Sequence, residues 1–147
     1  MKSQDWREIG GKKKYFRSHW EANYGLYLEF LKNHKQILDW EHEPKTFWFK
    51  GINRGCVSYK PDFQVFNLDG TWVWYEVKGY YDAKSITKHK RFAKYFPEEK
   101  LFIIDSKWFS RNAKQLSGLI TGWEKGSYRQ ILQNKVKKLY DKRNGFT

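Results

Sequence analysis

The sequence predicts a single α/β domain, and three observations support that prediction. Residues Ser18 to Lys32 place their apolar side chains along one stripe of a helix. Two later segments, Ser58 to Asn67 and Thr71 to Gly79, are rich in β-branched and aromatic residues, as is typical of strands. A second helix and a further strand follow, over Asp82 to Tyr95 and Lys100 to Ser106. The 147 residues are enough for one hydrophobic core but not for two.

The remaining segments complete the expected order of elements. Residues 1–14 are polar and end in three lysines that follow two glycines, so we expect a flexible basic arm. A strand is expected over Lys45 to Lys50, ahead of the two strands above. Residues 107–147 form a C-terminal extension that contains one more expected helix, Glu124 to Arg143, with basic residues beside its apolar stripe.

The turn between the two central strands decides which side chains face each other, and two registers are open. If Asp69 and Gly70 alone form a two-residue turn, Asp62 lies across from Val77. The carboxylates of Asp62 and Glu76 would then point to opposite faces of the sheet, because a shift of one residue reverses every side chain.

A three-residue loop over residues 68–70, with its glycine in the left-handed conformation, gives the other register. Asp62 then faces Glu76 and Lys60 faces Lys78, with cross-strand Cβ atoms about 5 Å apart. We favour this register because it gathers the charged residues on one face.

Two carboxylates and an ammonium in this arrangement indicate chemistry on phosphate. Asp62 and Glu76 would repel each other unless a cation lay between them, and Mg²⁺ is the usual cation of an all-oxygen site. Lys78 could stabilise a phosphoryl transition state or orient water. A net charge of +13 points to nucleic acid as the substrate. The alternative, an ordinary solvated strand face, is weakened by Trp72 and Trp74 on the same face.

Pro61-Asp62 followed by Glu76-Val77-Lys78 resembles the signature of the PD-(D/E)xK nuclease superfamily. The resemblance implies that Asp62 and Glu76 bind Mg²⁺, for which Mn²⁺ substitutes, and that the Val77 carbonyl contributes a ligand. It also implies that Lys78 serves the attacking water or the transition state, which makes the chain a metal-dependent endonuclease.

The same resemblance extends over residues 17–106, whose expected elements match the αβββαβ core of that superfamily, a restriction-endonuclease-like mixed sheet flanked by helices. Small size makes the chain most similar to phage and archaeal Holliday junction resolvases. Such an enzyme needs a homodimer, because a four-way junction has two-fold symmetry. The alternatives are another DNA endonuclease (restriction-like, transposon-end or nicking) and a non-catalytic DNA-binding module.

The superfamily also supplies an acidic residue from the first helix, and Glu21 is the candidate. Ser18 and Glu21 have the spacing of a capping box, in which the glutamate folds back onto a backbone amide. Metal binding and capping compete for this carboxylate, and both remain open. Glu41 and Glu43 are weaker substitutes and are expected on a loop.

Several cations are candidate phosphate contacts, although a solvated surface is the alternative for each. The candidates are Lys12, Lys13, Lys14, Lys60, Lys84, Lys88 and Arg91. The four histidines show no ligand spacing and are expected at the surface, with His89 as a further possible phosphate contact. The single cysteine excludes an intramolecular disulfide. With neither a signal peptide nor an apolar span, we expect a cytoplasmic location (the host cytoplasm if a phage encodes the chain) and no membrane partner.

Overall fold

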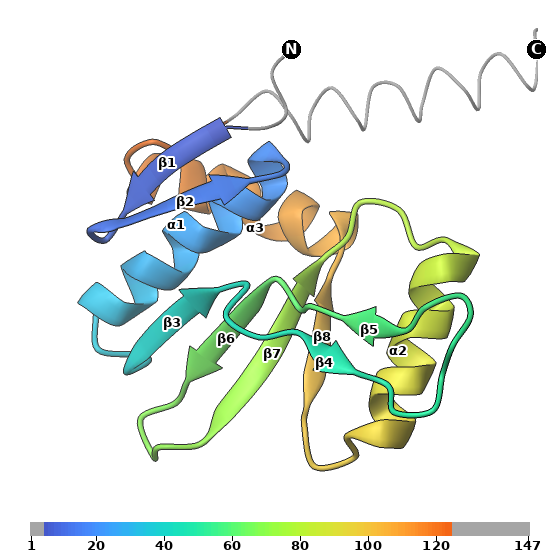
Figure 1. The fold of residues 1–147 in the computed structure, drawn as a ribbon. Helices are drawn as coiled ribbons and strands as arrows, with labels where there is room; N and C mark the ends of the chain where they lie inside the picture. The colour runs from blue at the N-terminus through green and yellow to red at the C-terminus, as the bar shows by residue number, and fades with distance from the viewer. Residues whose placement is uncertain (1–4, 125–147) are drawn as a thin grey trace, which may run out of the picture.

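The computed structural model describes residues 5–124 of the chain. Its centre is a mixed four-stranded sheet with the order β3-β6-β7-β8 (Figure 1). The strands are β3 (Asp39–His42), β6 (Phe63–Phe66), β7 (Trp72–Val77) and β8 (Leu101–Ile104). The pairs β3–β6 and β6–β7 are antiparallel, whereas β8 runs parallel to β7, to which a helical crossover connects it.

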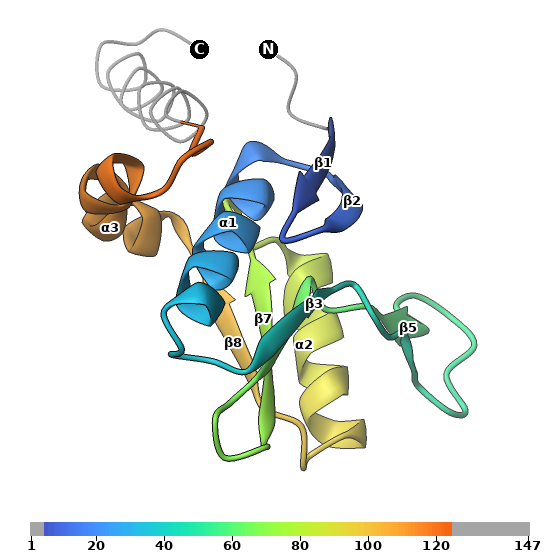
Figure 2. The same ribbon diagram turned by 90° about the vertical axis from the view of Figure 1, so that its left-hand side faces the viewer.

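Helices cover both faces of this sheet. Helix α1 (His19–Asn33) and helix α3 (Ser106–Leu119) lie on one face, and helix α2 (Ala83–Tyr95) lies on the other (Figures 1 and 2). A two-stranded ribbon of β4 (Phe47–Trp48) and β5 (Ser58–Tyr59) packs on the α2 side. The mixed α/β class expected from the sequence is therefore confirmed.

The sheet separates two hydrophobic cores. The larger core joins α1, α3 and the inner face of β3 and β6, and its fully buried members include Trp40, Phe63 and Phe109. The smaller core lies between the sheet, α2 and the β4–β5 ribbon, around Phe47, Trp74 and Phe92. Together they bury many of the aromatic residues that the composition supplies in excess of an average domain.

The turn between β6 and β7 has the three-residue form. Phe66 pairs with Trp72 and Phe63 pairs with Tyr75, which sets the register that brings position 62 opposite position 76. The amide of Gly70 donates to the Asn67 carbonyl at 3.0 Å, and Gly70 has a φ of +86°. A left-handed residue at this position closes such a loop, so the favoured register is confirmed.

The first two predicted helices begin at the predicted caps. The Ser18 hydroxyl accepts a hydrogen bond from the Glu21 amide at 3.1 Å at the start of α1. The Asp82 carboxylate accepts one from the Ser85 amide at 2.8 Å at the start of α2, which ends at Tyr95 before Pro97.

The expected flexible arm was wrong over most of its length. Residues 5–16 form an antiparallel hairpin of β1 (Asp5–Ile9) and β2 (Lys12–Phe16) that packs on α1. Gly10 and Gly11 form its turn, with φ values of +60° and +77°. The hairpin is held down because Ile9 and Phe16 are buried in the larger core.

The order of strands also differs from the expectation. The segment expected as a strand over Lys45 to Lys50 pairs only at β4 and lies outside the main sheet, whose first strand is the unpredicted β3. The long strand expected over Ser58 to Asn67 is broken into β5 and β6 at Lys60-Pro61-Asp62, since proline cannot donate to a ladder. Helix α3 was not predicted, and the expected helix Glu124 to Arg143 lies outside the described residues except for its first position. Within residues 5–124, no helix has the length and apolarity needed to span a bilayer.

Candidate functional site

Asp62 occupies the bend between β5 and β6 and turns its side chain toward the end of β7. Its Oδ2 accepts a hydrogen bond from the Val77 amide at 2.7 Å. Its backbone carbonyl accepts another from the Glu43 amide at 2.8 Å. These two bonds hold the bend between the ends of β3 and β7. Asp62 is only 9% exposed there.

Glu76 lies near the end of β7, beside Asp62. Its Oε2 accepts a hydrogen bond from the Tyr59 hydroxyl, which comes from β5. Its Oε1 lies 3.9 Å from Nζ of Lys78, two residues along the chain. The Lys78 amide donates to the Ile104 carbonyl at 2.9 Å, so the pairing of β7 with β8 continues to this lysine and holds its backbone in place.

Glu21 approaches the same place from the first turn of α1. Its Oε2 accepts hydrogen bonds from the Arg17 amide at 3.2 Å and from Nε2 of His42 at 2.9 Å. The carboxylate therefore folds back on the helix start, as a capping box requires, although onto Arg17 rather than Ser18. The same carboxylate also reaches the acidic cluster, so capping and a place in the site do not exclude each other.

The three carboxylates form one buried acidic cluster at the end of the sheet where β7 ends and α1 begins. Burial raises the pKa of Asp62 well above its ordinary value, and the charges of Glu76 and Glu21 raise it further. Burial likewise raises the pKa of Glu76, whereas Tyr59 and Lys78 lower it. Such mutual perturbation requires that the three groups lie close together, and it marks a candidate functional site.

His42 belongs to this cluster, although it was not among the predicted site residues. It was expected as a surface or loop residue, but it ends β3 and is 4% exposed, with its ring centroid 4.4 Å from that of Phe16. Its Nε2 also lies 3.9 Å from Glu43, so Glu21, His42 and Glu43 form a group with metal-ligand spacing. The only signal in the sequence was the spacing of Trp40 and His42, which lie two residues apart and so face the same side of a very short strand.

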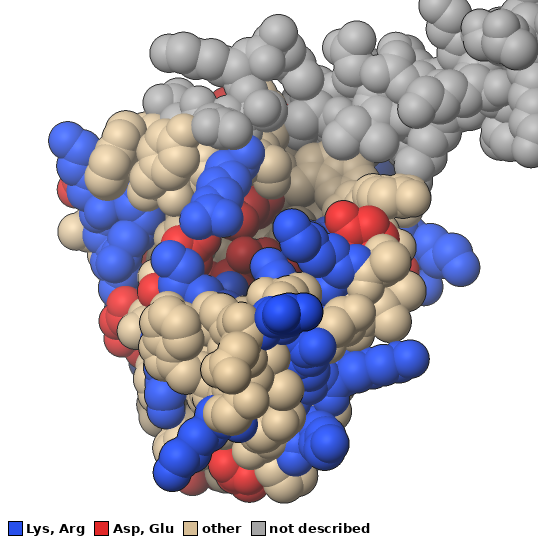
Figure 3. Space-filling view, turned by 45° about the vertical axis from the view of Figure 1, so that its right-hand side comes forward, with Lys and Arg blue, Asp and Glu red and all other residues tan. Residues whose placement is uncertain are grey.

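Cations surround the acidic cluster. Lys60 lies 3.4 Å from a Glu43 oxygen, and Arg17 lies 3.9 Å from the other. Lys88 on α2 is close enough to lower the pKa of Glu76. In the space-filling view, acidic side chains are sunk in a recess with Lys and Arg around its mouth (Figure 3). This distribution of charge would suit a divalent cation bound to the buried carboxylates. It would also suit an anionic ligand bound to the Lys and Arg side chains around the recess.

One family of proteins matches residues 5–115, the family described as DUF1064, protein of unknown function. The chain belongs to this family. The match runs from β1 into α3 and includes all three carboxylates and Lys78. No curated protein matches the chain.

The three lysines of β2 in this DUF1064 chain do not share one environment. Lys13 and Lys14 line a hollow of about 350 Å³ whose wall also includes Arg17, His42 and Glu43, so they remain candidate phosphate contacts beside the acidic cluster. Lys12 faces inward instead.

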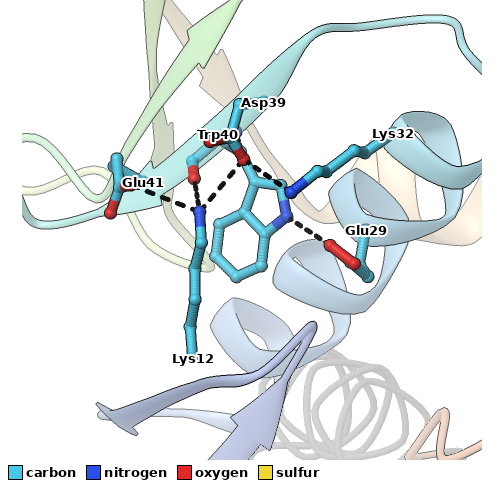
Figure 4. A network of polar contacts seen from close by, with 6 residues as sticks. All are labelled: Lys12, Glu29, Lys32, Asp39, Trp40 and Glu41. Atoms are coloured by element: carbon cyan, nitrogen blue, oxygen red, sulfur yellow. Dashed lines mark hydrogen bonds and ion pairs between the residues drawn. The ribbon is translucent and has the colours of Figure 1, made fainter.

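Lys12 is engaged inside the protein, which corrects its assignment as a phosphate contact. Its ammonium lies 3.0 Å from Asp39 Oδ1 and 3.3 Å from Glu41 Oε1, and it also donates to the Trp40 carbonyl (Figure 4). From the other side, Lys32 contacts the same Asp39 at 3.1 Å. This network ties the hairpin and α1 to β3 and is structural. It also places Glu41 on a strand rather than on the expected loop.

The basic residues of α2 also fall into two groups, those available to a ligand and those engaged within the protein. Lys84 is exposed and Lys88 lies near Glu76, as phosphate contacts would require. The guanidinium of Arg91 instead donates to the Cys56 carbonyl at 2.7 Å and holds the segment before β5. His89 turns inward, where Nδ1 bonds the Tyr81 hydroxyl and Nε2 is buried, so it does not serve as a phosphate contact.

Proposed function

We propose that this protein is a Mg²⁺-dependent endonuclease of the PD-(D/E)xK type that hydrolyses phosphodiesters in DNA. In this proposal the sheet, α1 and α2 correspond to a restriction-endonuclease-like core, and β1, β2 and α3 are additions to it. The observation that carries the proposal is the convergence of Glu21, Asp62 and Glu76, with Lys78 beside them, in one buried cluster.

The residues present fit a divalent cation. All three carboxylates are at least nine-tenths buried, and burying several like charges without a counter-ion is costly. Among the described residues, the ammonium paired with the cluster is that of Lys78, and at 3.9 Å from Glu76 it is beyond hydrogen-bond distance. Asp62, Glu76 and Glu21 would hold the cation, with the Val77 carbonyl as the fourth expected ligand. Mg²⁺ prefers such oxygen ligands, and Mn²⁺ is expected to substitute.

The cation would neutralise charge on a phosphate and lower the pKa of a bound water, which is the chemistry that carboxylates alone do not supply. The protein's part is to hold its own groups in place. Lys78 is anchored through its backbone to β8, so that its ammonium can face charge that develops on the phosphate or can orient the attacking water. The rim cations would bind the phosphates on either side of the cleaved bond.

We propose branched DNA, and four-way junctions in particular, as the substrate. Reading base edges in duplex DNA needs dedicated elements in a groove, and residues 5–124 offer few elements beyond the core for that purpose. Cleaving a junction symmetrically requires a homodimer with two sites. The location proposed for this activity is the cytoplasm.

Cleavage of an immobile four-way junction in Mg²⁺, beside a linear duplex of the same sequence, tests the proposal. Paired symmetric nicks in the junction alone, which are lost in EDTA and in Asp62→Asn, are the expected result. Equal cleavage of both DNAs would keep the nuclease chemistry but favour the alternative of a sequence-directed or general endonuclease.

Absence of cleavage in both DNAs, with binding that Asp62→Asn leaves intact, would favour a non-catalytic DNA-binding module and overturn the proposal. A lowered melting temperature in Asp62→Asn, together with loss of binding, would mean that Asp62 has a structural role.

A further inference from the structure

Tyr59 contacts the acidic cluster from outside the motif that defines it. It lies on β5, is 4% exposed, and packs its ring against Phe92 and His89 of α2 at 5.4 Å and 5.1 Å between ring centroids. Its hydroxyl donates to Oε2 of Glu76. The hydroxyl is the donor in this bond, because an ionised carboxylate only accepts hydrogen bonds.

The three carboxylates share one pattern of contacts. The Val77 amide binds one oxygen of Asp62, and His42 with the Arg17 amide binds one oxygen of Glu21. Tyr59 binds one oxygen of Glu76 in the same manner. The Asp62 and Glu21 side chains also approach each other closely enough to share a hydrogen bond, and the second oxygen of Glu76 lies 3.9 Å from the Lys78 ammonium.

A carboxylate with one oxygen fixed has its other oxygen aimed in one direction. Asp62, Glu76 and Glu21 lie close enough to perturb one another, so fixing one oxygen of each limits how far these groups must move to hold a cation. Among the described residues, the Tyr59 hydroxyl makes the one hydrogen bond to the Glu76 carboxylate, and Lys78 lies 3.9 Å from its other oxygen. Tyr59 is therefore the contact that restricts this long side chain most closely.

We propose that Tyr59 is a positioning residue that holds the Glu76 carboxylate in the orientation required to bind a divalent cation. This inference rests on the proposed function, since it assumes that the cluster is a metal site. It gives the β4–β5 ribbon a role in the site, because the ribbon delivers the tyrosine to Glu76. The competing explanation is that Tyr59 fills the smaller core and Glu76 satisfies its hydroxyl.

Divalent-cation binding to the metal-free protein separates these explanations without any nucleic acid. Tyr59→Phe keeps the ring and removes only the hydroxyl, and Tyr95→Phe is the matched control in the same core. Tyr95 packs against Phe49 and makes no contact with the carboxylates among the described residues. We expect Tyr59→Phe to weaken Mn²⁺ binding about 10-fold, as loss of a partner of a ligand commonly does, and Tyr95→Phe to leave it unchanged.

The concentration of free Mn²⁺, followed by electron paramagnetic resonance during titration, provides the binding curve. Cleavage supplies a second readout: Tyr59→Phe should require about 10-fold more Mg²⁺ for half-maximal rate and approach the wild-type rate at saturation. A residue that merely fills the core would lower the melting temperature and leave the metal dependence of the folded protein unchanged.

A variant with 4-aminophenylalanine at position 59 retains a donor at the same place and should restore much of the lost affinity. Equal Mn²⁺ affinity in wild type and in Tyr59→Phe would overturn the inference, and so would a 4-aminophenylalanine variant that binds Mn²⁺ no more tightly than Tyr59→Phe. If Tyr59→Phe does not fold, 4-fluorophenylalanine at position 59, which fills the space of the hydroxyl without a donor, takes its place in both comparisons. If the wild-type protein itself binds no Mn²⁺ or Mg²⁺, the proposed function fails, which is a distinct outcome.

Discussion

Replacing Lys12 with methionine is expected to loosen the β1–β2 hairpin without touching the acidic cluster. The ammonium contacts Asp39 at 3.0 Å, Glu41 at 3.3 Å and the Trp40 carbonyl, and it lies 4.8 Å from the centre of the Trp40 ring. Methionine keeps most of the aliphatic stem, so Lys12→Met removes these four contacts and little packing.

The expected loss can be worked out from exposure. The Asp39 and Glu41 side chains are 41% and 38% exposed, so solvent screening limits the two ion pairs to about 1 kcal/mol together. The bond from a charged donor to the Trp40 carbonyl contributes about 1.5 kcal/mol, and the ring contact about 0.5 kcal/mol. Lys12→Met should therefore destabilise the fold by roughly 3 kcal/mol and lower Tm by about 6–12 °C for a domain of this size.

Thermal unfolding at neutral pH without divalent cations measures this shift. Lys13→Met is the matched control, because Lys13 is the exposed neighbour on the same strand. Lys13→Met should leave Tm unchanged but reduce the salt dependence of DNA binding by about one unit of slope, whereas Lys12→Met should not reduce it. Equal melting temperatures for the two variants would refute the assignment of Lys12 to the fold.

Three further predictions concern the acidic cluster and α2. Asp62→Asn should raise Tm of the metal-free protein, because it removes a buried charge that Glu76 repels. It should also abolish the stabilisation expected from Mg²⁺. A lower Tm of the metal-free variant would contradict this prediction. The folded-state pKa values of Asp62 and Glu76 lie above their ordinary values of 3.8 and 4.5, so the stability they contribute is complete below about pH 4 and is lost as pH rises through the raised values. Urea unfolding across this range should show that decline in the wild type and a weaker one in Asp62→Asn, and identical profiles would count against it. Arg91→Met should cost about 1–2 kcal/mol in chemical denaturation, since it frees the Cys56 carbonyl, whereas Lys84→Met should cost nothing measurable; equal losses would show that α2 is held otherwise.

The parts of the fold that the sequence predicted correctly depend on local signals. Ser18 and Glu21 mark the start of α1 through contacts within one turn. The loop over residues 68–70 fixes its own register through Gly70, and that register places Asp62 beside Glu76. Wherever neighbouring residues determine the geometry, pattern and spacing were sufficient.

The parts that were missed depend on contacts between distant segments. Strand β3 has only four residues, and the charged Asp39 and Glu41 on it are stabilised by Lys12, 27 and 29 residues away. His42 is buried because Phe16 and Phe63 lie against its ring, and no spacing in the sequence indicates that. Tyr59 likewise reaches Glu76 only because the chain bends at Pro61.

The acidic cluster lies where the two hydrophobic cores meet, and one of these cores is much smaller than the other. Among the described residues, sixteen buried side chains form the core that carries Glu21, and five form the core around Tyr59. Opening of the thinner layer would withdraw the tyrosine while the rest of the sheet stays intact. If the cluster binds a cation as proposed, its cation affinity should therefore decline at the temperature where the α2 amides begin to exchange hydrogen, before the whole domain melts. Loss of the cation site on heating would then be a local and reversible event, governed by α2 and the β4–β5 ribbon.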